Sequence, residues 1–94
     1  MTSTPQTTEP VTIYATTWCP YCAKLIQSLK EMNIPFDGWD VEKHEDLSAF
    51  VESVNDGNRI VPTVLYSDGT TATNPDPKDV AAKYRELTGV SEGN

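Results

Sequence analysis

The pattern of apolar and polar positions predicts four strands. Val11–Ala15 and Thr63–Tyr66 are short apolar runs bounded by turn residues, which is typical of buried strands. Residues 36–41 alternate between apolar and polar imperfectly and predict a further strand. Asp68-Gly69 is a strong turn signal, so residues 70–73 should form a fourth strand, antiparallel to the one before the turn.

Apolar residues three and four positions apart predict three helices. The first, over residues 20–32, has an apolar pattern that consists of Ala23, Ile26, Leu29 and Met32. The second, over residues 45–55, has a stripe that consists of Leu47, Phe50, Val51 and Val54. The third has Asp76 as its N-cap and Pro77 at its first position, and Gly89 ends it.

The order of these elements predicts an α/β fold. A strand, a crossover helix and a second strand form a right-handed parallel unit. A helix, a hairpin and a last helix follow, so we expect one domain over residues 11–89. It should contain a four-stranded mixed sheet flanked by three helices. Residues 1–10, rich in Thr, Ser and Pro, should form a disordered N-terminal tail, and residues 90–94 a C-terminal tail.

Composition and charge limit which partners the protein can bind and in which cellular compartment it is expected. The formal net charge of −7 opposes binding to nucleic acid and to an anionic membrane surface. No apolar run approaches the roughly 20 residues that span a bilayer. Residues 1–10 lack the basic start and apolar core of a secretory signal. We therefore expect a monomeric cytoplasmic protein whose thiols cycle between oxidation states, with no membrane partner.

The chemistry concentrates in residues 18–23, Trp-Cys-Pro-Tyr-Cys-Ala, which join the first strand to the first helix. A helix N-terminus stabilises a thiolate with free backbone N–H groups and the positive end of the helix dipole. Cys19 precedes the helix and is therefore the expected nucleophile. Cys22 lies in the first turn and is the expected resolving or gating thiol. Pro20 suits the first helical position, where no N–H is needed.

Two other interpretations of the cysteine pair remain as alternatives. A structural disulfide here would close a loop of about four residues and stabilise the fold by only about 2 kcal/mol. A metal site would need further ligands, and His44, expected to be solvated near the second helix, is the only histidine. We expect no metal site within one chain, and an iron–sulfur cluster shared between two chains is the alternative.

The sequence resembles the glutaredoxin family in two motifs. Residues 19–22, Cys-Pro-Tyr-Cys, match the usual active-site tetrapeptide of dithiol glutaredoxins. Residues 57–66, Gly-Asn-Arg-Ile-Val-Pro-Thr-Val-Leu-Tyr, resemble the family segment whose cis-proline faces the cysteines. The resemblance implies a thioredoxin fold, thiol–disulfide oxidoreductase activity and a cis Val61–Pro62 bond; a trans proline at a strand start is the alternative. It also implies that the backbone of Val61 pairs with the cysteine of a bound thiol.

The positions that hold glutathione in this family are altered here. Thr16 replaces a lysine, Ile60 replaces a threonine, and Thr73-Asn74 followed by Asp76 replace two glycines and an acidic residue. A tryptophan before the Cys-Pro-Tyr-Cys box, Trp39-Asp40-Val41 in the second strand and Asn74-Pro75-Asp76-Pro77 before the last helix make the whole chain resemble the mycoredoxins. Their thiol is mycothiol, a cysteine–glucosamine–inositol compound without carboxylate or free amine. Hydrogen bonds to its sugar hydroxyls are expected from Thr16, Thr17, Thr73 and Asn74.

Three further residues are candidates for contact with the thiol or with a partner protein. Trp18 is expected at the active-site loop, with core packing as the alternative. Tyr21 should be exposed beside the sulfur. Arg59 resembles the basic residue that glutaredoxins carry at this place, with a solvated surface charge as the alternative.

The mycoredoxin resemblance implies a specific reaction. The substrate would be a protein–mycothiol mixed disulfide, and mycothiol would be the co-substrate, with no bound cofactor. A mycothiol disulfide reductase and NADPH would recycle mycothiol. One rival is a redoxin that thioredoxin reductase reduces and that donates electrons to ribonucleotide reductase. The other is a non-catalytic glutaredoxin that binds an iron–sulfur cluster.

Overall fold

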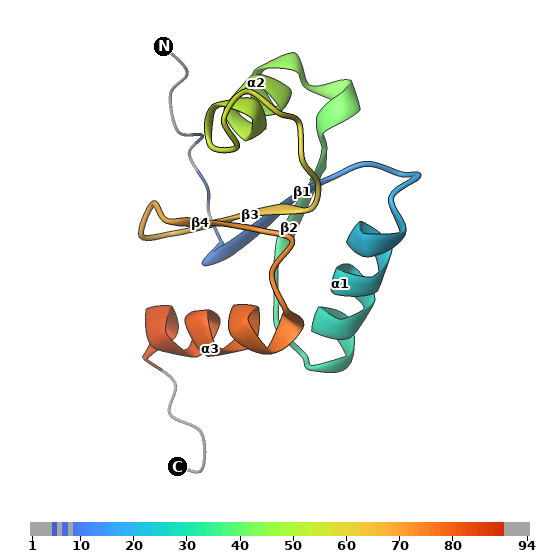
Figure 1. The fold of residues 1–94 in the computed structure, drawn as a ribbon. Coiled ribbons are helices and arrows are strands. Elements are labelled where there is room, and N and C mark those ends of the chain that lie inside the picture. The colour runs from blue at the N-terminus through green and yellow to red at the C-terminus, as the bar shows by residue number, and fades with distance from the viewer. Residues whose placement is uncertain (1–4, 6, 8, 90–94) are drawn as a thin grey trace.

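A sheet of four strands, in the order β2-β1-β3-β4, forms the centre of the protein (Figure 1). The structure is a computed structural model, and it describes residues 5, 7 and 9–89. The elements in chain order are β1 (Val11–Ala15), α1 (Pro20–Glu31), β2 (Asp37–Asp40), the 3-10 helix η1 (Val41–Lys43), α2 (Glu45–Ser53), β3 (Thr63–Tyr66), β4 (Thr71–Thr73) and α3 (Pro77–Thr88). Figure 1 shows α2 on one face of the sheet and α1 and α3 on the other. This confirms the predicted four-stranded mixed sheet with three α-helices.

β1 brings together two distant parts of the chain. It pairs in parallel with β2 and antiparallel with β3, and Tyr14 at its carboxyl end lies opposite Thr63 at the start of β3. The loop after β1 carries Cys19, and the residue before Thr63 is Pro62. Because paired antiparallel strands run in opposite directions, the end of one strand meets the start of the other. The sheet therefore places the Cys-x-x-Cys motif beside Val61 and Pro62.

Alternation along the central strands divides the core into two parts. Val11, Ile13 and Ala15 of β1 face the side covered by α1 and α3, whereas Tyr14 faces α2. The larger cluster also contains Cys19, Cys22, Leu25, Leu29, Ile34, Val64, Tyr66, Val80 and Ala81. The smaller cluster also contains Val41, Leu47, Phe50, Val51 and Leu65. Both thiols thus belong to the larger apolar cluster.

The predicted apolar face of α1 is partly wrong. The buried residues of this helix are Cys22, Leu25 and Leu29, whereas Ala23 is exposed and Met32 follows the last residue of the helix with 36% exposure. A stripe made only of three-residue steps rotates around a helix, because each step falls about 60° short of a full turn. A stripe with steps of three and then four residues stays on one face.

The predicted boundaries of several strands and helices, and the predicted environment of His44, also need correction. The strand predicted over residues 36–41 is shorter, and its last residue begins the unpredicted η1 helix. β4 begins one residue later than predicted, and α2 ends at Ser53, which leaves Val54 36% exposed. Gly57 follows α2 with φ +85°, the predicted left-handed conformation. His44 is half-buried, with its ring packed edge-on against Trp39 at 5.2 Å between centroids.

Most of the predicted tails, at residues 1–4, 6, 8 and 90–94, lies outside the described residues. Pro10, at the end of the predicted N-terminal tail, accepts a backbone hydrogen bond from Ser67 at 3.0 Å. Within the described part of the chain, no helix is long and apolar enough to cross a membrane.

The corrected face of α1 predicts a contrast between two alanine substitutions. Leu29→Ala should lower the free energy of unfolding by about 2–5 kcal/mol, because it opens a cavity in the larger cluster. Met32→Ala should change it by less than about 1 kcal/mol, because much of this side chain already meets solvent. Urea unfolding followed by circular dichroism measures both. Equal losses in the two variants would contradict the assigned face.

Candidate active site

The two cysteines lie at the start of α1, as predicted. Cys19 is the N-cap, with extended backbone angles of φ −89° and ψ 112°. Its sulfur accepts a hydrogen bond from the backbone N–H of Cys22 at 3.1 Å, and its carbonyl accepts one from Ala23 at 3.1 Å. Pro20 occupies the first helical position. The sulfur of Cys19 therefore takes one of the N–H groups that a helix N-terminus leaves free.

The second cysteine has a different environment. Cys22 is 1% exposed, and burial raises the pKa of its thiol to about 12. A hydrogen bond with Cys19 also raises this pKa, and a hydrogen bond from the backbone of Thr16 opposes the rise. Both cysteines are free thiols in the structure. Cys22 therefore retains its proton at neutral pH.

Alkylation should reveal the retained proton of Cys22. In the Cys19→Ser variant, Cys22 should react very slowly with iodoacetamide at pH 7, because the thiolate is the reacting species. The rate should keep rising beyond pH 10, since burial disfavours the thiolate even without Cys19. Mass spectrometry after timed quenching gives the rate at each pH. A rate that levels off near pH 8.5, the ordinary range of a free cysteine, would contradict this assignment.

Val61 and Pro62 lie opposite the cysteines. The bond between them is cis, as the resemblance implied. The thiol of Cys19 donates a hydrogen bond to the carbonyl of Val61, with 3.7 Å between sulfur and oxygen. The carbonyl of Pro62 accepts a hydrogen bond from the backbone N–H of Asn74 at 2.8 Å. Three segments that are far apart in sequence therefore meet at one end of the sheet.

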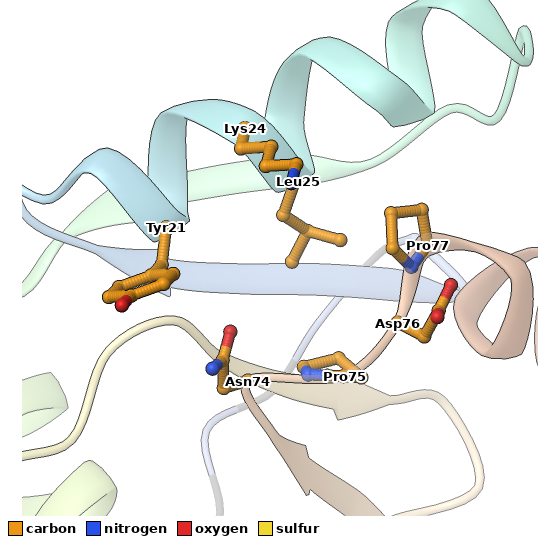
Figure 2. Close-up of a pocket in the computed structure, with 7 residues that line it drawn as sticks. All are labelled: Tyr21, Lys24, Leu25, Asn74, Pro75, Asp76 and Pro77. Carbon is orange, nitrogen blue, oxygen red and sulfur yellow. The ribbon is translucent and has the colours of Figure 1, made fainter.

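A cleft of about 270 Å³ adjoins the Cys-x-x-Cys motif. Its lining residues are Tyr21, Lys24, Leu25, Asn74, Pro75, Asp76 and Pro77 (Figure 2). Figure 2 shows Tyr21 of α1 above Asn74, which projects upward from the segment after β4. Tyr21 is 64% exposed, and the carboxylate of Asp76 accepts a hydrogen bond from the backbone N–H of Lys78 at 3.0 Å. The cleft therefore offers a phenol and an amide side chain to a ligand.

The structure does not bring all the predicted thiol-binding residues into this cleft. Thr16 is 6% exposed and, with Thr17, lines a different hollow that also contains Cys19, Cys22 and Trp39. The hydroxyl of Thr16 has no hydrogen-bond partner among the residues that the structure describes. The hydroxyl of Thr73 donates a hydrogen bond to Asn55. Among the candidates, Tyr21, Asn74 and Asp76 share the cleft.

Glu42 is a site residue that the sequence reasoning missed. Its carboxylate accepts a hydrogen bond from the indole N–H of Trp18 at 3.0 Å and forms an ion pair with Arg59 at 3.9 Å. Trp18 is 65% exposed, so it does not belong to the core. Glu42 thus links the loop before Cys19 to the segment before Val61. No sequence signal identifies it, because the contacts span 24 and 17 positions.

The described part of the chain contains no group of three His, Cys, Asp or Glu side chains that could hold a metal ion.

Comparison with known proteins shows the family to which the chain belongs. The glutaredoxin family pattern matches residues 11–70. The chain is 56% identical to Mycoredoxin 1 of Corynebacterium glutamicum over 77 residues, which cover 82% of this chain and 95% of that protein. It is 45% identical to a putative glutaredoxin of Mycobacterium tuberculosis over 82 residues, which cover 87% of this chain and 98% of that protein.

Solved structures agree on the fold. The solution structure of a glutaredoxin from Brucella melitensis has a TM-score of 0.64 at 20% identity, covering 97% of this chain and 98% of that one. The holo form of glutaredoxin C1 from Populus tremula x tremuloides has a TM-score of 0.61 at 22% identity, covering 86% and 81%. These similarities confirm the thioredoxin fold. Taken with the sequence relatives and with the dithiol at the start of α1, they lead to one conclusion: the chain belongs to the glutaredoxin family of thiol–disulfide oxidoreductases.

Proposed function

We propose that this protein reduces protein–mycothiol mixed disulfides through Cys19, with mycothiol as electron donor. The observation that carries the proposal is the 56% identity to Mycoredoxin 1 across 95% of that protein. Membership of the glutaredoxin family already implies thiol–disulfide exchange. The proposal adds the identity of the small thiol.

The charges around the dithiol support a thiol without carboxylates. Arg59, the basic candidate for binding a carboxylate, pairs with Glu42 and lines a hollow with Glu45, Asp46 and Glu52. A carboxylate of glutathione would have to displace Glu42 from Arg59. The exposed pair itself is worth only about 0–1 kcal/mol, so its main effect is to neutralise the charge that a ligand would meet.

The cleft that Tyr21 of the Cys-x-x-Cys motif lines supports the same assignment. Tyr21 and Asn74 present neutral hydrogen-bonding groups there, and Lys24 and Asp76 add one charge of each sign. A sugar hydroxyl both donates and accepts, so a phenol and an amide are suitable partners. The net charge of this lining is therefore close to zero, which fits a neutral ligand.

The first half of the reaction uses Cys19 as the nucleophile. Its thiolate attacks the mycothiol sulfur of the mixed disulfide, and the bond from mycothiol to the substrate protein breaks. The protein sulfur leaves with the electron pair and takes a proton from water. In this step, the backbone of Val61 orients the bound thiol. The carbonyl oxygen of Val61 lies 3.7 Å from the Cys19 sulfur.

The second half of the reaction regenerates Cys19. The thiolate of a second mycothiol attacks the mycothiol sulfur bound to Cys19, which forms mycothiol disulfide and releases the Cys19 thiolate. Attack by Cys22 is the competing route. It requires the Cys22 thiolate, which burial disfavours by raising the pKa of this thiol to about 12. The proposed scheme therefore uses the route through a second mycothiol.

The scheme determines the partners. Mycothiolated proteins are the substrates, and mycothiol disulfide reductase with NADPH returns the second product to mycothiol. The protein acts as a monomer in the cytoplasm and binds no cofactor. The experiment that tests the proposal supplies the oxidised protein with mycothiol and this reductase and measures NADPH consumption.

A further inference from the structure

A buried amide lies at the end of α2, close to the active site but outside the cleft. Asn55 is 9% exposed. Its side-chain nitrogen donates to the carbonyl of Val51 at 2.8 Å and to the hydroxyl of Thr63 at 3.1 Å. Its side-chain oxygen accepts from the hydroxyl of Thr73 at 2.5 Å. Both donors and the acceptor of the amide are therefore in use.

The orientation of this amide determines where the hydroxyl of Thr63 donates its hydrogen bond. A hydroxyl group carries a single hydrogen. Because the oxygen of Thr63 accepts from Asn55, that hydrogen is directed to the carbonyl of Ile60, with 2.6 Å between the oxygens. The backbone carbonyl of Asn55 also accepts from the backbone N–H of Asn58 at 3.0 Å and from its side chain at 3.2 Å. The network around Asn55 thus reaches both ends of the segment that leads to Val61.

This segment has little regular structure to support it. Residues 58–62 lie between α2 and β3, outside any helix or strand. Hydrogen bonds of Asn58 to Asn55, Ile60 to Thr63, Pro62 to Asn74 and Val61 to Cys19, together with the ion pair of Arg59 with Glu42, tie them to the rest of the fold. The backbone carbonyl of Asn55 takes part in the first, and its side-chain amide orients the second. The bond that holds the carbonyl of Ile60, and with it the neighbouring Val61 carbonyl beside Cys19, therefore depends on this amide.

We propose that Asn55 is a positioning residue for thiol–disulfide exchange, because it holds the backbone of Val61 in place to pair with a bound cysteine. Asn55 does not line the cleft, and its side-chain hydrogen bonds go to Val51, Thr63 and Thr73. A fully satisfied buried polar network favours a single arrangement more strongly than apolar packing does. The proposal rests on thiol–disulfide exchange and does not depend on mycothiol.

The test compares two reagents that differ in their need for Val61. The disulfide of N-acetylcysteine amide carries the N–H and C=O groups that can pair with the backbone of Val61, whereas iodoacetamide reacts with the Cys19 thiolate alone. Asn55→Leu, which is similar in size, should slow the reaction of Cys19 with the disulfide about five- to tenfold. Alkylation of Cys19 by iodoacetamide should stay within about twofold, because the helix N-terminus is unchanged.

Other variants separate positioning from stability. Thr63→Val removes the hydroxyl that Asn55 orients and should reproduce the selective loss, whereas Thr63→Ser should retain the wild-type ratio of rates. The double variant of Asn55→Leu and Thr63→Val should lose little more than either single variant, because both interrupt one network. Ser53→Ala is the matched control. It removes a hydroxyl-to-carbonyl bond of 2.6 Å at the end of α2, outside the network, and should leave the ratio unchanged.

The result that overturns the proposal is a folded Asn55→Leu protein whose two rates are unchanged or fall together. Circular dichroism and thermal unfolding establish that the variant is folded. If Asn55→Leu does not fold, Thr73→Val gives the same decision, because it removes one bond of the amide at an exposed residue. A selective loss in Thr73→Val supports positioning, and unchanged rates overturn it.

Discussion

Cys19→Ser should abolish the reduction of mixed disulfides, whereas Cys22→Ser should retain much of the activity. Loss of Cys19 removes the nucleophile, so we expect a decrease of at least about 10³-fold. A serine hydroxyl in its place cannot form the mixed disulfide with the small thiol. The N–H of Cys22 that now binds the Cys19 sulfur would then stabilise no reactive anion.

The retained activity of Cys22→Ser follows from the environment of Cys22. In the reduced protein, burial raises the pKa of its thiol to about 12, and burial disfavours its attack on the Cys19 mixed disulfide at neutral pH. A second small thiol performs that step in solution and does not need Cys22. Serine also preserves the size of the side chain inside the larger core cluster. We therefore expect activity within about threefold of the wild type.

The measurement is the release of thiol from a mycothiolated reporter protein, with an excess of mycothiol present. Thermal unfolding of both variants shows whether the fold is intact. Mass spectrometry of Cys22→Ser during turnover should detect a single mycothiol adduct on Cys19. Substantial turnover by Cys19→Ser would show that the nucleophile is wrongly assigned, and a dead but folded Cys22→Ser would establish the dithiol route instead.

The oxidised protein should turn over with mycothiol and its disulfide reductase, much more slowly with glutathione, and little with thioredoxin reductase. The neutral groups of Tyr21 and Asn74 in the cleft suit a sugar-bearing thiol. The ion pair of Arg59 with Glu42 removes an attraction for glutathione carboxylates. We expect the mycothiol system to be faster than glutathione by about tenfold or more, which corresponds to about 1.4 kcal/mol.

NADPH consumption at matched thiol concentrations compares the three donors. The Cys19→Ser protein is the control in each assay, because it shows how much NADPH the coupling enzymes consume without exchange. Efficient turnover with thioredoxin reductase and none with mycothiol would refute the proposed function. That outcome would favour the redoxin that serves ribonucleotide reductase. An ultraviolet–visible spectrum of the purified protein would reveal an iron–sulfur cluster.

Features that depend on neighbouring residues could be predicted from the sequence. The continuous apolar run of Val11–Ala15 is fully buried in β1. Asp76 and Pro77 begin α3 as N-cap and first residue, and Cys19 caps α1. Such features depend on backbone groups within a few positions, so local chemistry determines them. The cis Val61–Pro62 bond required the resemblance to glutaredoxins as well, because a lone proline favours trans.

Features that join distant segments depended on the tertiary structure. The sequence alone indicated neither that Glu42 links Trp18 to Arg59 nor that Thr16 lies buried away from the cleft. Asn55 did leave a signal, since it stands four positions after Val51 on the apolar side of the second helical pattern. Its partners in β3 and β4 could not be inferred. Side-chain partners across a sheet depend on how strands and helices pack. The spacing of residues along the chain does not determine that packing, so these partners could not be predicted from the sequence.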